Sequence, residues 1–180
     1  MYGLITELYP ICRSITGDGV RESLDVLKKY IPVEIHEVPT GTRVFDWTVP
    51  REWNIRDAWV KDLKGNRVID FRKSNLHVLN YSTPVQKKVS FRELREHLFT
   101  LPEHPEWIPY RTSYYNEIWG FCLNHKDFLN LKDDDYEVFI DSDLRNGHLT
   151  YGECFIEGRR SDEVLAVSYT HLTLPTNREV

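Results

Sequence analysis

A change of hydrophobic period at Pro32 is the feature that most constrains the fold of this chain. Apolar residues recur at helical spacing from Leu4 to Cys12, which predicts a short helix. A second helix should follow from a cap at Asp18 to about Tyr30, because proline at position 32 cannot continue it. From Val33 onward the pattern alternates with period two, which is typical of strands. The sequence therefore predicts an α/β fold that begins with helices and continues as many short strands.

The remaining elements are expected to be short and separated by turn residues. We expect two more helices, over 91–98 with Ser90 as its cap and over 124–131 with Asn124 as its cap. Between them, the proline-bounded stretch 100–115 should be a long irregular loop, and such loops are usually functional. Strands are predicted over 33–38, 43–49, 56–63, 67–71, 76–81, 85–89, 119–123, 136–141, 150–157 and 162–166.

This order of elements favours two units. An α/β core would be formed by residues 1–41 and 152–166, and a strand-rich domain, residues 42–151, would be inserted in it.

The last fourteen residues are expected not to be native. Residues 167–176 are the translation of one reading frame of a transposase sequencing adapter. Such a segment does not belong to the natural protein. We therefore expect residues 167–180, which include His171, to contribute neither to the fold nor to a functional site. We expect the natural sequence to be interrupted at about Ala166.

Composition and charge exclude several classes of function. A net charge of -5 and a pI near 5.8 argue against a nucleic-acid surface, which needs a basic stripe. The sequence contains no apolar run of about 18 residues, so no membrane span is predicted. The first residues lack the charged and then apolar order of a signal peptide. Cys12, Cys122 and Cys154 are odd in number and widely spaced, which predicts reduced thiols and a cytoplasmic location.

General catalytic motifs are missing from the sequence: it contains no His-Glu-x-x-His, no Gly-x-Ser-x-Gly and no phosphate-binding glycine loop. His97 and His104 are the closest histidines that could share a metal, and His77 is expected to be structural. The acidic run 133–135 is expected to be a solvated turn, because it lacks the ligand spacing of a calcium loop. We therefore assign no catalytic residue and no metal ligand in this chain.

Several longer stretches together resemble one family. They lie at 10–17 (PICRSITG), 44–47 (VFDW), 52–58 (EWNIRDA), 108–115 (IPYRTSYY), 119–122 (WGFC), 140–142 (IDS) and 149–153 (LTYGE). This set is similar to the bacterial aminopeptidase-like proteins often labelled polysaccharide biosynthesis protein with aminopeptidase-like domain, which are relatives of the zinc exopeptidases. The resemblance extends from Met1 to about Leu165.

The resemblance implies a zinc-exopeptidase-like core, truncated here, with a mostly β inserted domain. In that family the first zinc ligands follow a strand like 163–165, so zinc is expected in the full-length parent and none in this chain. The implied activity is that of a zinc-dependent aminopeptidase-like hydrolase acting on a small peptide or amino-sugar substrate, with no nucleic-acid or membrane partner. Two alternatives are a non-peptidase binding or assembly factor for surface polysaccharide and an amidase acting on an aminosugar. The sequence leaves the oligomeric state open.

Four residues are candidates for substrate contact. Arg13 precedes a glycine-containing turn, where its guanidinium could bind a substrate carboxylate or could instead anchor the first helix in a salt bridge. Tyr114, Tyr115 and Trp119 could form a wall of the cleft or could pack onto their own sheet. Cys122 could be a nucleophile, although a buried apolar role fits a cysteine that has no visible base partner.

Overall fold

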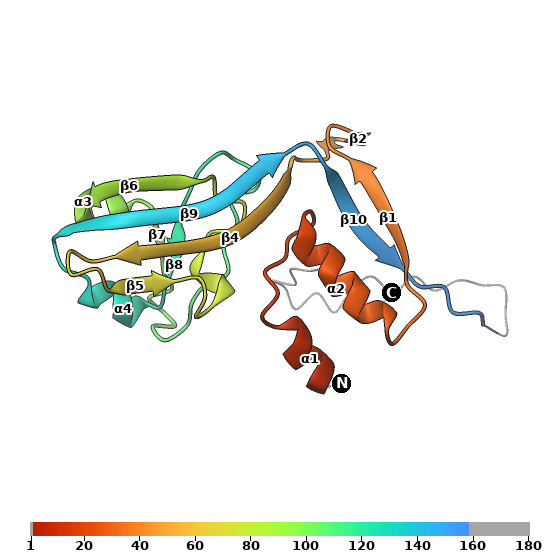
Figure 1. Cartoon of the computed structure of the whole chain (residues 1–180), viewed down its shortest axis with the longest axis horizontal. Coiled ribbons are helices and arrows are strands. Elements are labelled where there is room, and N and C mark those ends of the chain that lie inside the picture. The colour runs from red at the N-terminus through yellow and green to blue at the C-terminus, as the bar shows by residue number, and fades with distance from the viewer. Residues whose placement is uncertain (1, 159–180) are drawn as a thin grey trace.

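The computed structural model describes residues 2–158, which form a mixed α/β fold with small sheets and short helices (Figure 1). The helices are α1 (Tyr2–Leu8), α2 (Asp18–Lys28), η1 (Asn75–His77), α3 (Phe91–Arg95) and α4 (His125–Asn130). The strands are β1 (Glu34–Pro39), β2 (Arg43–Val44), β3 (Trp47–Thr48), β4 (Glu52–Lys61), β5 (Arg67–Asp70), β6 (Val85–Ser90), β7 (Leu98–Phe99), β8 (Phe121–Cys122), β9 (Asp135–Arg145) and β10 (His148–Glu153).

An antiparallel sheet in the order β5-β4-β9-β6 forms the larger unit. β4 and β9 pair from Glu52↔Arg145 to Lys61↔Glu137, with a bulge between Ile55 and Asp57. Buried residues alternate along β9 from Tyr136 to Ser142, because successive side chains of a strand point to opposite faces. One face of the sheet therefore carries an apolar row that must be covered.

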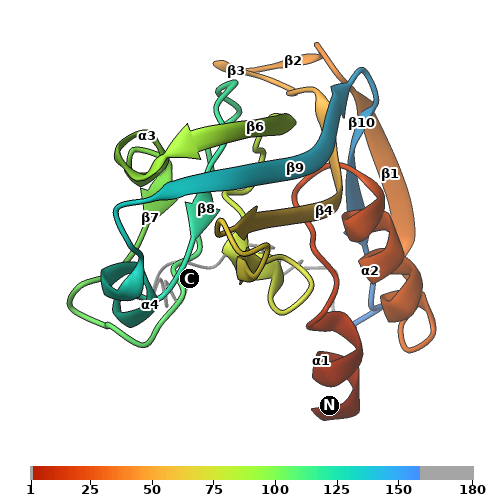
Figure 2. The same ribbon diagram turned by 60° about the vertical axis from the view of Figure 1, so that its left-hand side comes forward.

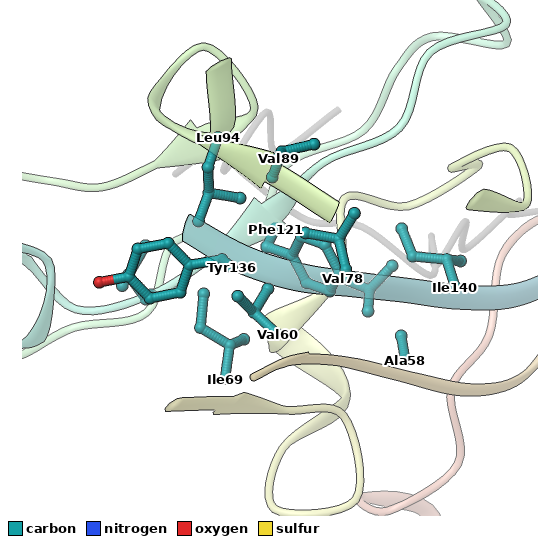
Figure 3. Packing of buried hydrophobic residues seen from close by; sticks show 11 residues of the cluster. Ala58, Val60, Ile69, Val78, Val89, Leu94, Phe121, Tyr136 and Ile140 are labelled. Carbon is teal, nitrogen blue, oxygen red and sulfur yellow. The ribbon is translucent and has the colours of Figure 1, made fainter. Parts of the chain in front are cut away.

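The cover of this face comes from the segments between β6 and β9. β7 and β8 form a short parallel pair, and α3 and α4 lie beside them (Figures 1 and 2). Their side chains close one hydrophobic cluster with those of the sheet, in which Phe121 and Leu94 are fully buried (Figure 3). The labelled members of this cluster are Ala58, Val60, Ile69, Val78, Val89, Leu94, Phe121, Tyr136 and Ile140.

A smaller unit, called the terminal unit below, consists of residues 2–39 and 148–158, which contain α1, α2 and the β1–β10 ribbon. β1 and β10 pair antiparallel from Glu34↔Glu153 to Pro39↔His148. α2 packs on β10, where Gly152 permits close approach: a β-carbon there would overlap Leu24 and Val33. The long strands β4 and β9 run from the larger sheet toward this ribbon (Figures 1 and 2).

Most predicted elements exist, and three expectations about them were wrong. The strand expected over 43–49 is a hairpin of two short strands, β2 and β3, with a turn at Phe45 and Asp46. Asp18 is not the cap of α2: Gly17 occupies that position without a side-chain bond, and Asn54 Oδ1 accepts the Asp18 amide instead at 2.7 Å. The expected strand 76–81 is a turn of 3₁₀ helix, Asn75–His77, followed by single bridges at Val78 and Asn80. The caps at Ser90 and Asn124 are confirmed.

The strand expected over 162–166, the segment 167–180 and His171 lie outside the described residues. Within residues 2–158, no helix combines the length and the apolar character that a membrane crossing requires. All three cysteines are free thiols.

The close passage of Gly17 beside β4 generates the first prediction. Gly17 has φ +89°, and a β-carbon there would overlap the Trp53 carbonyl oxygen, a backbone atom that cannot move aside. Gly17→Ala should lower the free energy of unfolding by about 3 kcal/mol through backbone strain and overlap together. Urea denaturation followed by tryptophan fluorescence measures this loss.

Gly65→Ala is the matched control, because Gly65 has φ +83° with open space around it. Only the conformational cost remains there, about 1 kcal/mol. Equal losses for the two variants would contradict the steric role of Gly17.

Candidate functional site

The segment between α1 and α2, residues 9–17, packs against β4 and forms the centre of the candidate site. It is called the inserted segment below and is distinct from the inserted domain. Thr16 is 1% exposed, and its Oγ1 lies 2.6 Å from the Tyr81 hydroxyl and accepts the Trp53 amide at 3.1 Å. Ser14, equally buried, donates its hydroxyl to the Thr16 carbonyl at 2.8 Å. Buried hydroxyls need such partners, so this segment has one fixed path across the end of β4.

A second set of bonds converges on the Ser82 carbonyl. Trp53 Nε1 donates to it at 2.9 Å and Ser142 Oγ donates at 2.7 Å, so the carbonyl links β4 to β9. The Trp53 ring also stacks on the Tyr81 ring with centroids 5.6 Å apart. Tyr81 is 2% exposed, and burial raises its pKa to about 12, so its phenol stays protonated at neutral pH.

A buried carboxylate, Glu52, joins the two units. Its side chain is 4% exposed, and its oxygens accept bonds from Arg21 of α2 at 2.7 Å and from Arg145 of β9 at 3.2 Å. The amide of His148, the first residue of β10, adds a bond at 3.1 Å. The hydrogen bond from Arg21 is the largest cause that lowers the pKa of Glu52 to about 2, although burial opposes it.

A cavity of about 470 Å³ opens at this junction, within the size range of small-ligand sites. Its charged groups are largely paired already: Arg56 binds Asp141 and Asp143, and Arg145 binds Glu52. Asp143 Oδ1 is buried and accepts no hydrogen bond from the described residues. The lining is made up of Pro10, Ile11, Cys12, Ser14, Thr16, Asp18, Gly19, Glu22, Trp53, Asn54, Ile55, Arg56, Phe71, Asp143 and Arg145.

The cysteine in this cavity is not activated. Burial raises the pKa of the Cys12 thiol to about 11, which leaves almost no thiolate at neutral pH. Cys122 is fully buried and burial raises its pKa to about 12, which agrees with the apolar role among its two alternatives. Burial thus disfavours the thiolate form of both cysteines, so neither is predisposed to act as a nucleophile.

Arg13 lies between two residues that line the cavity, Cys12 and Ser14, and its carbonyl accepts a hydrogen bond from Asn80 Nδ2 at 3.3 Å. Its guanidinium donates to the Leu8 carbonyl at the end of α1, 2.8 Å away, and to Ser23 Oγ of α2 at 3.2 Å. These bonds connect the two helices through a carbonyl and a hydroxyl, whereas the anchoring alternative in the sequence analysis named a salt bridge.

Tyr115 lies close to the inserted segment through its contact with Tyr81, and Tyr114 precedes it in the same turn. The Tyr115 ring meets the Tyr81 ring edge-on at 4.8 Å and the Trp47 ring at 6.1 Å. Both tyrosines have left-handed backbones, with φ 50° and 69°, and their residues are 78% and 39% exposed. They present aromatic surface to solvent from a constrained loop.

Trp119 packs against different neighbours. Its ring stacks on His97 with centroids 3.5 Å apart, and Lys87 Nζ lies 5.2 Å from its centre. The structure thus brings Tyr115 to Tyr81 beside the inserted segment, while Trp119 contacts the side chains near β6 and β7.

The histidines are occupied by separate contacts. His97 stacks on Trp119, His104 stacks on Trp107, and His77 Nδ1 lies 2.8 Å from the Cys122 carbonyl. Among residues 2–158, no three His, Cys, Asp or Glu side chains are grouped so that they could hold a metal ion. The residues described here therefore do not fit a zinc site.

Comparison with known proteins identifies the family. Residues 52–143 match the family described as "Domain of unknown function (DUF2172)". The chain belongs to this family. It is also 57% identical over 170 residues to a Clostridium acetobutylicum protein named "Putative polysaccharide biosynthesis protein with aminopeptidase-like domain". This match covers 94% of the chain and 39% of the relative, so the chain spans about two fifths of that protein's length.

A solved structure agrees with this match. It is described as the crystal structure of a "putative peptidase" from Clostridium acetobutylicum. It is 60% identical to this chain and superposes with a TM-score of 0.81 over 84% of this chain and 36% of its own. The two matches confirm the resemblance to aminopeptidase-like proteins. The sequence motifs carried this resemblance. Glu52 belongs to one of them, residues 52–58, but its role as a buried ion-pair partner was not predicted.

The Glu52 contacts generate the second prediction. A carboxylate whose pKa falls from 4.5 to about 2 on folding stabilises the protein fully above pH 4.5, and this stabilisation is lost as the pH falls toward 2. The shift corresponds to about 3 kcal/mol. Glu52→Gln should therefore destabilise the protein at pH 7 and flatten the dependence of unfolding free energy on pH between 5 and 2. Urea denaturation at each pH measures both effects.

Glu117→Gln is the control, because Glu117 pairs with Arg51 at the surface with its side chain 69% exposed. Solvent screens such a pair, so its removal should change stability by less than about 1 kcal/mol. If both variants keep the wild-type slope, Glu52 is not the buried link between the units.

Proposed function

We propose that this chain is part of a zinc-dependent aminopeptidase-like hydrolase and that it helps to bind and position a small peptide or amino-sugar substrate. Bond cleavage is assigned to residues outside 2–158. The observation that carries the proposal is the likeness to the solved Clostridium structure at 60% identity and a TM-score of 0.81.

The junction geometry supports a binding role. The cavity lies where the segment before α2 meets β4 and β9, and it combines apolar walls with paired charges. Tyr115, which contacts Tyr81, offers partly exposed aromatic surface near the same segment, and the Arg13 guanidinium connects α1 and α2 beside it. Tyr114, the preceding residue, is 78% exposed. A fixed polar framework of this kind keeps a cavity open without movement on binding.

Zinc belongs to the proposal only through the longer relatives. Because the described residues do not fit a metal site, no step of the chemistry is assigned to them. We propose that the catalytic groups lie in the part of the relative that this chain does not match, which is the larger part of its length.

We propose a core and an inserted domain, as the sequence predicts with bounds 1–41 and 152–166 for the core and 42–151 for the insert. The second boundary is moved from 151/152 to before His148, because β10 (His148–Glu153) lies in the terminal unit. The chain leaves the terminal unit through β1 and returns to it through β10, which pairs with β1. A cytoplasmic location stays a prediction from the cysteines.

A polysaccharide-binding role without hydrolysis is the second candidate, favoured by the name of the Clostridium relative and by the exposed aromatic side chains. An aminosugar amidase would combine recognition of a sugar with hydrolysis. Substrate preference distinguishes the three functions.

The third prediction compares this chain with the full-length Clostridium relative. The relative should hydrolyse amino-acid p-nitroanilides and lose that activity when a chelator removes its metal, with recovery on addition of zinc. This chain alone should be inactive and should bind no zinc, because its described residues offer no ligand set. Release of p-nitroaniline and metal analysis of both purified proteins measure these outcomes.

The amidase alternative is tested in parallel with N-acetylglucosamine as substrate. Release of acetate would favour an aminosugar amidase. An inactive, metal-free relative that binds amino sugars would replace the hydrolase proposal with the binding role. Zinc bound tightly by this chain would contradict the assignment of the ligands to the unmatched part.

A further inference from the structure

Large apolar side chains are exposed throughout the terminal unit. α1 buries no residue at all, although its apolar positions are spaced as on a helix that packs against something. The residues of this unit that leave apolar surface in solvent are Tyr2, Ile5, Tyr9, Tyr30, Ile31, Tyr151, Phe155 and Ile156, with Tyr2 84% and Ile156 82% exposed.

The contacts that hold α1 are almost all polar and peripheral. Arg13 donates to the Leu8 carbonyl, Lys29 pairs with Glu7 at 2.9 Å, and Asn75 Nδ2 donates to the Tyr9 carbonyl at 3.2 Å. Helices shorter than about 12 residues are marginal in water without tertiary packing, and α1 has 7. These bonds fix where α1 lies. Leu4 and Leu8 are half-buried, whereas Tyr2 and Ile5 leave most of their apolar surface exposed.

The ribbon has a similar deficit. A two-stranded sheet is marginal by itself, and α2 covers the ribbon face that carries Gly152. On the other face, His36 stacks on Tyr151 with centroids 5.1 Å apart, and Tyr151 remains 41% exposed. The terminal unit therefore resembles part of a layered domain of which one layer is missing.

We infer that the apolar surface of α1 and the ribbon is the docking face for the rest of the polypeptide in the longer relatives. This occupant is favoured because the matched region makes up only 39% of the Clostridium relative, so more than half of that chain lies elsewhere. The four-stranded unit, by contrast, already has a closed core of its own. An intact partner would bury α1 and add a layer to the ribbon.

The fourth prediction tests this inference in two settings. The first is the 180-residue chain, and the second is a chimera in which its residues 2–158 replace the matched part of the Clostridium relative. Ile5→Ser should lower the melting temperature of the chimera by at least about 3 °C, because it removes apolar contact with the docked remainder. The same substitution should shift the 180-residue chain by less than about 1 °C, since Ile5 is 56% exposed there.

Phe45→Ser is the matched control, because Phe45 is 91% exposed on the β2–β3 hairpin and lies outside the terminal unit. It should leave both proteins unchanged. A chimera that tolerates Ile5→Ser as well as Phe45→Ser would overturn the inference.

Hydrogen exchange provides a second measurement that needs neither a variant nor a chimera. Amides of α1 should exchange at nearly unprotected rates in the 180-residue chain and at least about 100-fold more slowly at the aligned positions of the intact Clostridium relative. Equal rates in the two proteins would contradict docking. Sedimentation of the 180-residue chain tests whether a second copy of the chain occupies this face instead. A dimer that Ile5→Ser dissociates, together with unprotected α1 amides in the Clostridium relative, would assign the face to a second copy and overturn the inference.

Discussion

The Glu52 carboxylate is the contact on which the arrangement of the two units depends. Moving a carboxylate out of water costs several kcal/mol, and its removal from a buried pair leaves the opposite charge uncompensated. Glu52 offsets that cost with Arg21, Arg145 and the His148 amide, which come from α2, β9 and β10. Gly147 is part of the same solution, because a β-carbon there would overlap the Glu52 side chain. The turn before β10 therefore has its path set by a charge on β4.

Local patterns predicted the elements well where local chemistry decides them. The alternation in 33–38 predicted β1, and the strand predicted over 136–141 is much of β9. Ser90 and Asn124 cap their helices through their own side chains. The failures come from distant partners. Asp18 is of a residue type that often caps helices, yet the Asp18 amide at the start of α2 donates its hydrogen bond to Asn54, which is 36 residues away. The segment 76–81 alternates as a strand does, but Tyr81 adopts φ 68° so that its hydroxyl can reach Thr16.

The candidate site was harder to predict, because its contacts join segments that are far apart in the sequence. The position of Arg13 before a glycine-containing turn, and the loop that carries Tyr114 and Tyr115, predict candidates for substrate contact but do not specify their neighbours in the fold. Only the fold shows that Tyr115 reaches Tyr81 and that Trp119 instead stacks on His97. The family could be named from contiguous sequence motifs. The hydrogen bonds of Glu52 to Arg21 and Arg145 join residues 31 and 93 positions apart, so no contiguous motif contains them.

Backbone strain separates two kinds of aromatic residue at this junction. Left-handed conformations cost a bulky residue about 1–3 kcal/mol, and they persist where the surroundings impose them. At Tyr81 the cost is offset by burial, by stacking on Trp53 and by the bond to Thr16. Tyr114 carries the same strain while it is 78% exposed, so burial within the described residues does not offset it. Phe45 has the same combination, with φ 54° and 91% exposure, and both residues lie in turns, so the backbone of Tyr114 does not by itself mark a binding contact. The place of Tyr114 at the wall of a cleft stays a prediction.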